Sequence, residues 1–340
     1  NMLFGISNNS FLSGFYVSRY RLNLFGNFTY FQEDPLNGDA HEQVDSRWIY
    51  GGHFDYQREV NSRVNLRMGF DLRSDQIGEV ALHSVENRIR LGLIRQDSVD
   101  WLSLGVFSEL EIDLSDKLKG LLGVRVDYSD YDVLSDMPDN SGKGSDDIWL
   151  PSAGLVYEVG RFGELYLNWG KGFHSNDVRG TTIAYDPVSK TALEPIEVFS
   201  GQEGAEVGYR IERDDDLVLS LAYFWLQSDS ELIFAGDSGA TEASDGSERS
   251  GLELALFWEL NSNWVLDLTG SIVDSKFVAV DAKFDHIPNA HGRVISMGLT
   301  HAPVLGWNWS MRVRHFGDAA LVEDDSINYP STTIVNMGLS

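Results

Sequence analysis

The sequence contains no cysteine. Disulfide frameworks, zinc sites with cysteine ligands and thiol catalysis are therefore excluded. Long hydrophobic runs are also missing, since no stretch approaches the roughly 18 apolar residues of a transmembrane helix. This second absence is compatible with a membrane barrel, because barrel strands carry their apolar residues in alternation with polar ones.

Basic residues are scarce. The chain has 26 Lys and Arg against 52 Asp and Glu, which gives a net charge of -26. Binding of nucleic acid requires a basic surface, so we expect no nucleic-acid partner. Acidic residues cluster in predicted connections, for example at Asp130, Asp132, Asp136, Asp139, Asp146 and Asp147. They keep exposed loops soluble or, alternatively, bind divalent cations beside anionic lipopolysaccharide or attract a cationic ligand.

A regular alternation of apolar and polar residues is the main positive signal. Successive side chains of a strand point to opposite faces, so an alternating segment has one apolar and one polar face. In residues 118–128 the apolar face carries Leu118, Leu122, Val124, Val126 and Tyr128, and the polar face carries Lys119, Gly123, Arg125 and Asp127. Charges cannot line a soluble core unless each one is paired. The pattern therefore indicates an apolar exterior around a polar lumen.

The same alternation recurs along the chain, and its connections are alternately short and long. Further alternating segments lie at 63–73, 164–170, 202–211, 217–225, 264–272 and 307–314. Short connections are predicted near 59–62, 113–117, 158–163, 212–216, 259–263 and 301–306. Long ones are predicted near 33–46, 74–100, 131–147, 171–201, 229–250, 278–291 and 317–331, and residues 80–95 suggest a hairpin that extends beyond the membrane. Short periplasmic turns and long external loops alternate in this way in outer-membrane barrels.

We therefore expect an all-β, transmembrane, antiparallel up-and-down β-barrel. About fourteen strands fit between residue 21 and residue 340, with one or two more before residue 21. No linker divides the chain, so residues 1–340 form one unit. The chain starts at Asn1 without a leader pattern and stops at Ser340 within an alternating run, so we expect a fragment of a longer exported protein.

Nothing in the sequence is spaced as a reaction or a metal site requires. The histidines are scattered, and no pair has the i, i+4 spacing of a helical zinc motif. His286 and His291 share one loop with Asp281 and Asp285, where a weak metal or haem site is the alternative to solvated loop residues. No Gly-x-Ser-x-Gly elbow and no complete phosphate-loop motif occurs. We assign no catalytic residue, metal or cofactor, and we expect no enzyme.

Charged residues on the polar strand faces are expected to point into the lumen. They are Arg63, Arg67, Arg73, Arg125, Asp127, Glu206, Arg210, Arg312 and Arg314. They pair across strands and solvate the interior or, alternatively, contact a plug domain or line a substrate path. Contact with a plug is the natural form of the second interpretation, because barrels of more than about 18 strands are usually plugged.

Six motifs occur in a recognisable order. They are Gly-Val-Arg-Val-Asp-Tyr at 123–128, Leu-Pro-Ser-Ala-Gly-Leu-Val-Tyr at 150–157, Leu-Tyr-Leu-Asn-Trp-Gly-Lys-Gly-Phe at 165–173, Glu-Gly-Ala-Glu-Val-Gly-Tyr-Arg at 203–210, Ser-Gly-Leu-Glu at 250–253 and Ile-Pro-Asn-Ala-His at 287–291. Their order and spacing resemble the barrel of TonB-dependent outer-membrane receptors. The chain departs from that pattern after Phe173, where His-Ser-Asn-Asp replaces the Arg-x-Pro of many members. The Asn-Pro-x-Leu motif of haem receptors is also missing from 190–195, which disfavours haem uptake.

The resemblance implies about 14–16 strands of a barrel of about 22, with the plug domain outside this chain. It implies uptake of a scarce, bulky nutrient across the bacterial outer membrane, with ferric siderophores as the leading class. The implied partners are outer-membrane lipid and lipopolysaccharide, the protein's own plug domain, the TonB complex, and a ferric chelate or other small-molecule ligand. The predicted ligand contacts, in the loop 171–201, are Phe173, His174, Asn176, Asp177 and Arg179. Support of the corner between strand and loop is the alternative role of these five residues.

Three other interpretations remain open at this point. A passive porin of about 16 strands would share the alternation. An outer-membrane enzyme would share the barrel, and a soluble adhesin-like sandwich would share the strands. The sequence does not specify the transported substrate or the oligomeric state.

Overall fold

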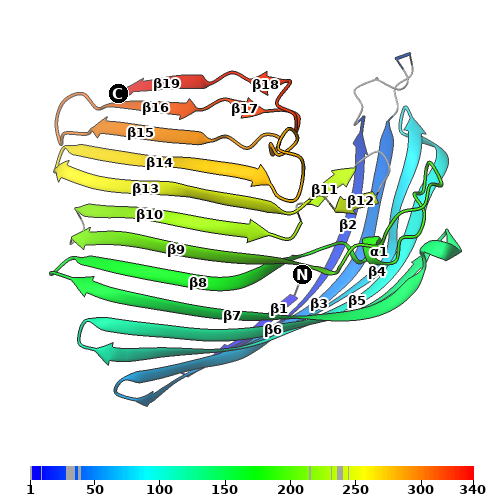
Figure 1. Ribbon diagram of the computed structural model, residues 1–340, viewed down its shortest axis with the longest axis horizontal. Coiled ribbons are helices and arrows are strands. Elements are labelled where there is room, and N and C mark those ends of the chain that lie inside the picture. The colour runs from blue at the N-terminus through cyan, green and yellow to red at the C-terminus, as the bar shows by residue number, and fades with distance from the viewer. Residues whose placement is uncertain are drawn as a thin grey trace.

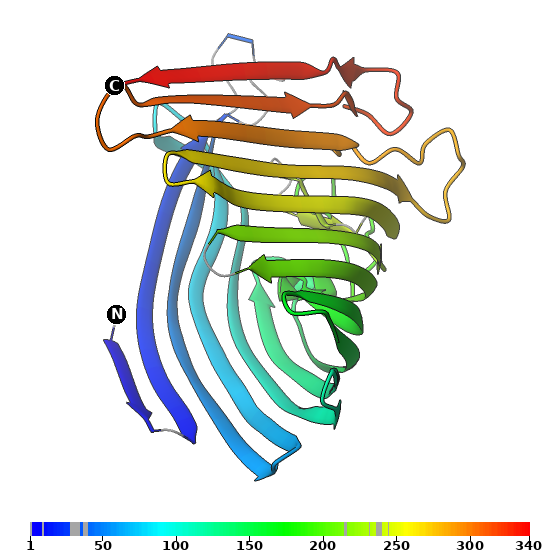
Figure 2. The ribbon, with the colours of Figure 1, turned by 90° about the vertical axis from the view of Figure 1, so that its left-hand side faces the viewer.

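The chain folds into one large antiparallel sheet, which a computed structural model describes for residues 2–8, 10–27, 35–36, 40–213, 216–230, 232–235, 240–243 and 245–340. Fifteen strands form the sheet, and each strand pairs with the next in the order β1 to β10, then β13, β14, β15, β16 and β19. The sheet curves strongly about an open interior, and β1 and β19 are its two edges (Figure 1, Figure 2). The predicted all-β, up-and-down architecture and the predicted strand number for this chain are confirmed.

The elements have the following bounds. The strands are β1 Met2–Ser7, β2 Phe11–Gly26, β3 His41–Asn61, β4 Val64–Glu86, β5 Ile89–Ser115, β6 Leu118–Ser135, β7 Gly142–Val159, β8 Gly163–Ser175, β9 Phe199–Arg213, β10 Leu217–Ser228, β11 Leu232–Ala235, β12 Ala240–Ala243, β13 Ser247–Asn261, β14 Trp264–Phe277, β15 Arg293–His301, β16 Trp309–Phe316, β17 Ala319–Ala320, β18 Asn328–Tyr329 and β19 Thr332–Leu339. The helices are a 3-10 turn, η1 Pro138–Asn140, and a single α-turn, α1 Val178–Thr181. Among the described residues, none of the helices has the length and apolar character needed to cross a membrane.

Short turns lie at one end of the sheet, and the long connections lie at the other end together with the short β4–β5 turn. β3–β4, β5–β6 and β13–β14 are joined by two-residue turns, on the left of Figure 1. The connections that contain α1, the β11–β12 hairpin and the β17–β18 pair lie on the right. We call these the short-turn end and the long-loop end. The predicted connections 33–46, 212–216 and 229–250 fall partly outside the described residues.

Two of the predicted long connections are instead mostly strand. β4 and β5 run through the region 74–100 and meet at a turn of two residues, Asn87 and Arg88, both with positive φ. This confirms the predicted hairpin at 80–95. Likewise, β6 and β7 reduce the predicted loop 131–147 to residues 136–141. Polar composition suggested loops there, but the backbone ladder continues as far as the Val133–Gly142 pair and satisfies the backbone hydrogen bonds.

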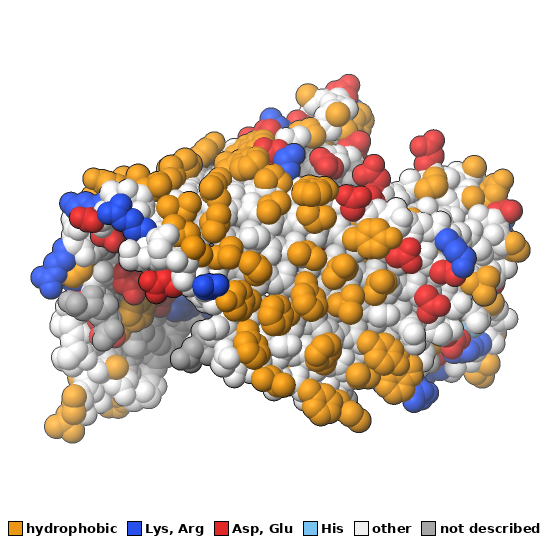
Figure 3. Space-filling model, turned by 90° about the horizontal axis from the view of Figure 1, so that it is seen from below, with side chains coloured by type: hydrophobic (Ala, Val, Ile, Leu, Met, Phe, Trp, Pro, Cys, Tyr) orange, Lys and Arg blue, Asp and Glu red, His pale blue; other side chains and the backbone are white. Residues whose placement is uncertain are grey.

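The two faces of the sheet differ in chemistry. On β6, Leu122, Val124 and Tyr128 are exposed on the outer face, while Arg125 and Asp127 lie on the inner face. Hydrophobic side chains gather in a broad band across the outer face, and charged side chains lie mostly toward its ends (Figure 3). An apolar area of this extent requires an apolar environment.

Candidate functional site

The inner face of strands β3 to β6 carries a network of arginine–carboxylate pairs. Arg67 binds Asp55 at 2.5 Å and Glu109 at 3.2 Å, from the strands on either side. Arg125 binds Asp71 at 3.0 Å and Asp127 at 2.6 Å. Arg67, Glu109 and Asp71 remain about half-exposed, so this wall is polar and accessible and keeps hydrogen-bonding capacity for a further partner.

The register of the strands places the predicted lumen residues on this same inner face. Arg73 binds Asp75 at 2.6 Å, Arg210 binds Glu212 at 2.7 Å and Arg312 binds Asp267 at 2.7 Å. Glu206 is paired with Asn168 in the ladder, and Arg314 donates to the Asn336 side chain at 3.5 Å. Arg63 differs in that it lies in the β3–β4 turn rather than within a strand.

At the long-loop end, the β8–β9 hairpin leaves the wall and folds inward. The β7–β8 ladder ends at the Ser152–Gly170 pair, whereas the β6–β7 ladder continues to Val133–Gly142. The connection between β8 and β9, residues 176–198, then lies inside the curved sheet, with α1 against β5 and β6 (Figure 1). We call residues 176–198 the inward segment.

The inward segment is seated on a hydrophobic cluster of the wall. Val178 and Val198 pack with Ile77 of β4, Val99 of β5 and Val133 of β6, and all five side chains are buried. Phe199 joins them, and its ring lies edge-on to that of Phe173 at 4.9 Å. The segment is therefore part of a packed core and not a loose surface loop.

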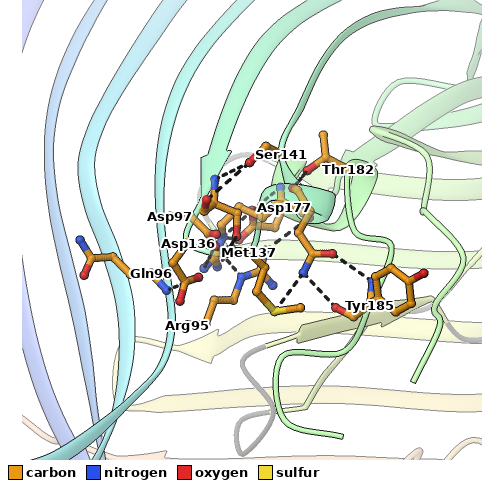
Figure 4. Close-up of polar contacts among 12 residues, drawn as sticks. Arg95, Gln96, Asp97, Asp136, Met137, Ser141, Asp177, Thr182 and Tyr185 are labelled. Atoms are coloured by element: carbon orange, nitrogen blue, oxygen red, sulfur yellow. Dashed lines mark hydrogen bonds and ion pairs between the residues drawn. The ribbon is translucent and has the colours of Figure 1, made fainter. Parts of the chain in front are cut away.

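A cluster of four charges lies beside these apolar contacts (Figure 4). On β5, Arg95 binds Asp97 at 2.5 Å, and both side chains are almost fully buried. From the segment, Arg179 approaches Asp97 at 3.7 Å and binds Asp177 at 2.6 Å. Burial by itself would raise the pKa of Asp177, but the charge of Arg179 and its hydrogen bonds outweigh burial and lower the pKa to about 2. Asp177 therefore remains ionised at neutral pH and attracts the Arg179 guanidinium group.

A second anchor comes from the neighbouring β6–β7 connection. Asn140 is 1% exposed, and its Oδ1 atom accepts hydrogen bonds from the backbone N–H groups of Ala184 and Tyr185 at 2.9 Å each. Its Nδ2 group donates to the Tyr185 carbonyl oxygen at 2.9 Å. The Thr182 hydroxyl donates to the Asn140 carbonyl oxygen at 2.8 Å. One buried amide therefore fixes the backbone on both sides of the Ala184–Tyr185 peptide.

The tip of the inward segment is a compact turn. A Tyr185–Ala192 bridge closes it, and the Asp186 carboxylate accepts hydrogen bonds from the backbone N–H groups of Val188 and Ser189. These bonds outweigh burial and lower the pKa of Asp186. Tyr185 is 40% exposed, and its ring points away from the wall strands in Figure 4.

Four of the five residues predicted to contact ligand, Phe173, Asn176, Asp177 and Arg179, make contacts that hold this segment in place. Phe173 packs on Phe199, and the buried Asn176 donates to the Glu197 carbonyl oxygen at 2.7 Å. Asp177 caps α1 by accepting from the Arg179 N–H at 3.0 Å. His174 is the second-last residue of β8 and pairs in the ladder with Ser200 of β9. Their contact with a ligand stays a prediction.

Sequence reasoning missed Arg95, Asp97 and Asn140. A signal for the first two exists, because the spacing Arg-x-Asp puts both side chains on one face of a strand. The same spacing occurs in the bonded pairs Arg73–Asp75 and Arg125–Asp127. Asn140 carries no such signal, since its partner is the backbone of a distant segment.

The described part of the chain contains no group of three or more His, Asp or Glu side chains that could hold a metal ion. His286 lies 3.4 Å from Asp285, and His291 is hydrogen-bonded through Nδ1 to the Gly317 carbonyl oxygen at 2.8 Å. These loop histidines are thus not brought together into a metal site.

Comparison with known proteins places these features in a family. Residues 4–340 match the family model described as TonB dependent receptor-like, beta-barrel. The copper transporter OprC matches with a TM-score of 0.76 at 14% identity, covering 98% of this chain and 56% of that one. The ferric yersiniabactin uptake receptor FyuA from Yersinia pestis matches with a TM-score of 0.72 at 14% identity, covering 98% and 52%. The ferric-catecholate import receptor Fiu from K12 E. coli matches with a TM-score of 0.71 at 11% identity, covering 98% and 55%.

The present chain spans about half the length of these solved structures. At such low identity they demonstrate a shared fold, whereas the family model covers nearly every residue. The chain belongs to the TonB-dependent receptor family and forms part of its β-barrel.

Proposed function

We propose that the protein containing this chain lies in the bacterial outer membrane and takes up a scarce, bulky nutrient with energy from the TonB complex. Ferric siderophores are the substrate class that we favour. The observation that carries the proposal is the family match over residues 4–340. Solved structures of the same fold include receptors named for ferric yersiniabactin and ferric catecholates.

The geometry of the wall supports uptake through an occupied interior. The inner face is lined with half-exposed charges such as Arg67 and Glu109, and such a surface suits a polar domain packed inside the barrel. We propose that this domain is a plug supplied by another part of the same protein. The half-exposed guanidinium groups would bind it through hydrogen bonds that the strand-to-strand pairs leave free.

The outer face supports a position in lipid. Leu122 and Leu167 are among many large apolar side chains that are about half-exposed there, and burial of such area in lipid would stabilise the barrel. We propose phospholipid and lipopolysaccharide as its surroundings. The family is one of receptors and transporters, and we propose no enzymatic activity.

Growth under iron limitation tests the substrate class. Cells lacking the gene are compared with cells that carry it, on ferric citrate, a ferric hydroxamate or a ferric catecholate as the sole iron source. The proposal predicts a gene-dependent growth advantage with one of these chelates. Equal growth on all of them would reject ferric chelates as the cargo.

A further inference from the structure

We propose that the inward segment is a fixed constriction of the barrel mouth, not a mobile gate, and that buried Asn140 is the positioning residue that presents Tyr185 to the ligand. The inference rests on the proposed function for the identity of the ligand, but the fixed seating is independent of it. Three features of the described residues support this proposal.

The first feature is the anchoring of the segment along its length. Val178 and Val198, near its two ends, are each 2% exposed and belong to the wall cluster. Ile183, in the middle, is also buried. Movement away from the wall would expose these side chains together with Ile77, Val99 and Val133, so the apolar contacts oppose opening.

The second feature is the charge cluster. Displacing the segment would remove Arg179 from Asp97 and would uncover the buried Arg95–Asp97 pair. Arg95 also donates to the Arg179 carbonyl oxygen at 3.5 Å. A hinge that opens in each cycle would have to break this network every time, whereas a permanent constriction keeps it intact.

The third feature is the orientation of the tip. Asn140 holds the backbone of Tyr185 through both its N–H and its C=O, and the Tyr185 side chain stays 40% exposed. A rigidly held phenol ring offers a flat apolar face with a polar end. This combination suits the planar or aromatic part of a bulky chelate, so Tyr185 would act as a specificity determinant.

A disulfide lock tests the fixed seating. An ideal Cβ at Gly142 lies 3.4 Å from the Thr182 Cβ, which is close to the usual Cβ separation in a disulfide. Gly142→Cys with Thr182→Cys therefore ties the segment to β7, and the chain has no cysteine of its own. The matched control is Ser152→Cys with Gly170→Cys, a ladder pair of adjacent strands whose Cβ separation would be 3.3 Å.

Each cysteine pair is introduced into the full-length receptor in cells. Formation of the disulfide on oxidation is then followed in the absence of ligand. A fixed segment predicts that the 142–182 crosslink forms as fast and as completely as the 152–170 crosslink. Uptake of a labelled ferric chelate is expected to be equal before and after oxidation, with the single cysteine variants as further controls. Slow or partial crosslinking would overturn the proposal, as would a loss of uptake on oxidation that reduction restores.

Affinity for the ferric chelate tests the role of Asn140. Tyr185→Ala is expected to weaken binding about tenfold, the scale of one aromatic contact. Asn140→Ala is expected to weaken binding to a similar extent, and the double variant to be no worse than either single one, because Asn140 acts through Tyr185. Additive losses, or unchanged affinity in Tyr185→Ala, would contradict the positioning role. If the wild-type receptor binds none of the three chelates, the substrate class fails, while the crosslinking result still decides the seating.

Discussion

Arg95 and Asp97 form an ion pair of 2.5 Å on the inner face of β5, and both side chains are at most 3% exposed. Removing one member of such a pair leaves a buried charge without compensation. Asp97→Ala is therefore expected to destabilise the long-loop end by about 3–5 kcal/mol. The measurement is the denaturant dependence of unfolding in detergent or lipid. Lys143→Ala breaks the exposed Lys143–Asp132 pair and should cause no measurable change, so equal losses in the two variants would contradict the buried role of Asp97.

The contacts that hold the inward segment against the wall are expected to weaken at acid pH. The pKa of Asp177 is lowered to about 2, so its pairing with Arg179 contributes its full stabilisation above the ordinary carboxyl pKa. That contribution is lost as the pH falls from the ordinary value near 3.8 toward about 2. Pepsin cleavage within residues 176–198, normalised to a free peptide of the same sequence, should rise over this range. The Asp177→Asn variant should be cleaved readily already at pH values near 3.8. A cleavage rate of the wild-type protein that does not change with pH would contradict the stabilising role of the Asp177–Arg179 pair.

A side chain at Gly105, on the inner wall, would crowd the neighbouring Arg125–Asp127 ion pair. An added Cβ there would lie 2.0 Å from Nη2 of Arg125 and 2.5 Å from Oδ1 of Asp127. Gly105→Ala is expected to push these side-chain ends aside, to weaken this pair and to cost about 1 kcal/mol of unfolding free energy. Gly172 is the matched control, because a Cβ at this strand position meets nothing within 4 Å. Gly172→Ala should leave stability unchanged or slightly improved, and equal effects at the two positions would refute the steric explanation.

A charge introduced on the outer face of a strand should lower folding stability more than a charge introduced on its inner face. Leu167 is about half-exposed on the outer face of β8, and Asn168 follows it on the inner face, opposite Glu206. Leu167→Arg should destabilise folding into phospholipid vesicles by about 2–4 kcal/mol if the residue lies near the bilayer centre. Asn168→Arg should have little effect, since its side chain enters the polar interior. Equal tolerance of arginine at both positions would contradict a lipid-facing exterior.

Much of the wall was predictable from sequence because a strand repeats every two residues. That period assigns Arg125 and Asp127 to one face and Val124 and Tyr128 to the other. In the structure Arg125 binds Asp127, whereas Val124 and Tyr128 are exposed. The inward segment was less predictable. Composition identified 171–201 as a long connection, but the seating of Val178 on Val99 and Val133 depends on contacts between residues far apart in the chain.

The same limit explains the differences at the candidate site. Asp177 and Arg179 were singled out by position, yet Asp97, which Arg179 approaches, lies 82 residues earlier, on β5. Alternation continues through 80–95 in polar surroundings, so composition alone underestimated how far β4 and β5 extend. Arg-x-Asp spacing in strands is the one additional signal that would have identified Arg95 and Asp97.

Energy dependence of uptake separates a TonB-coupled receptor from a passive channel most directly. Accumulation of iron from a labelled ferric chelate is measured in cells that carry the full-length protein, with and without a functional TonB complex. The proposed function predicts saturable accumulation that requires both the protein and TonB. Accumulation that persists without TonB and rises linearly with chelate concentration would contradict it and would indicate a passive pore.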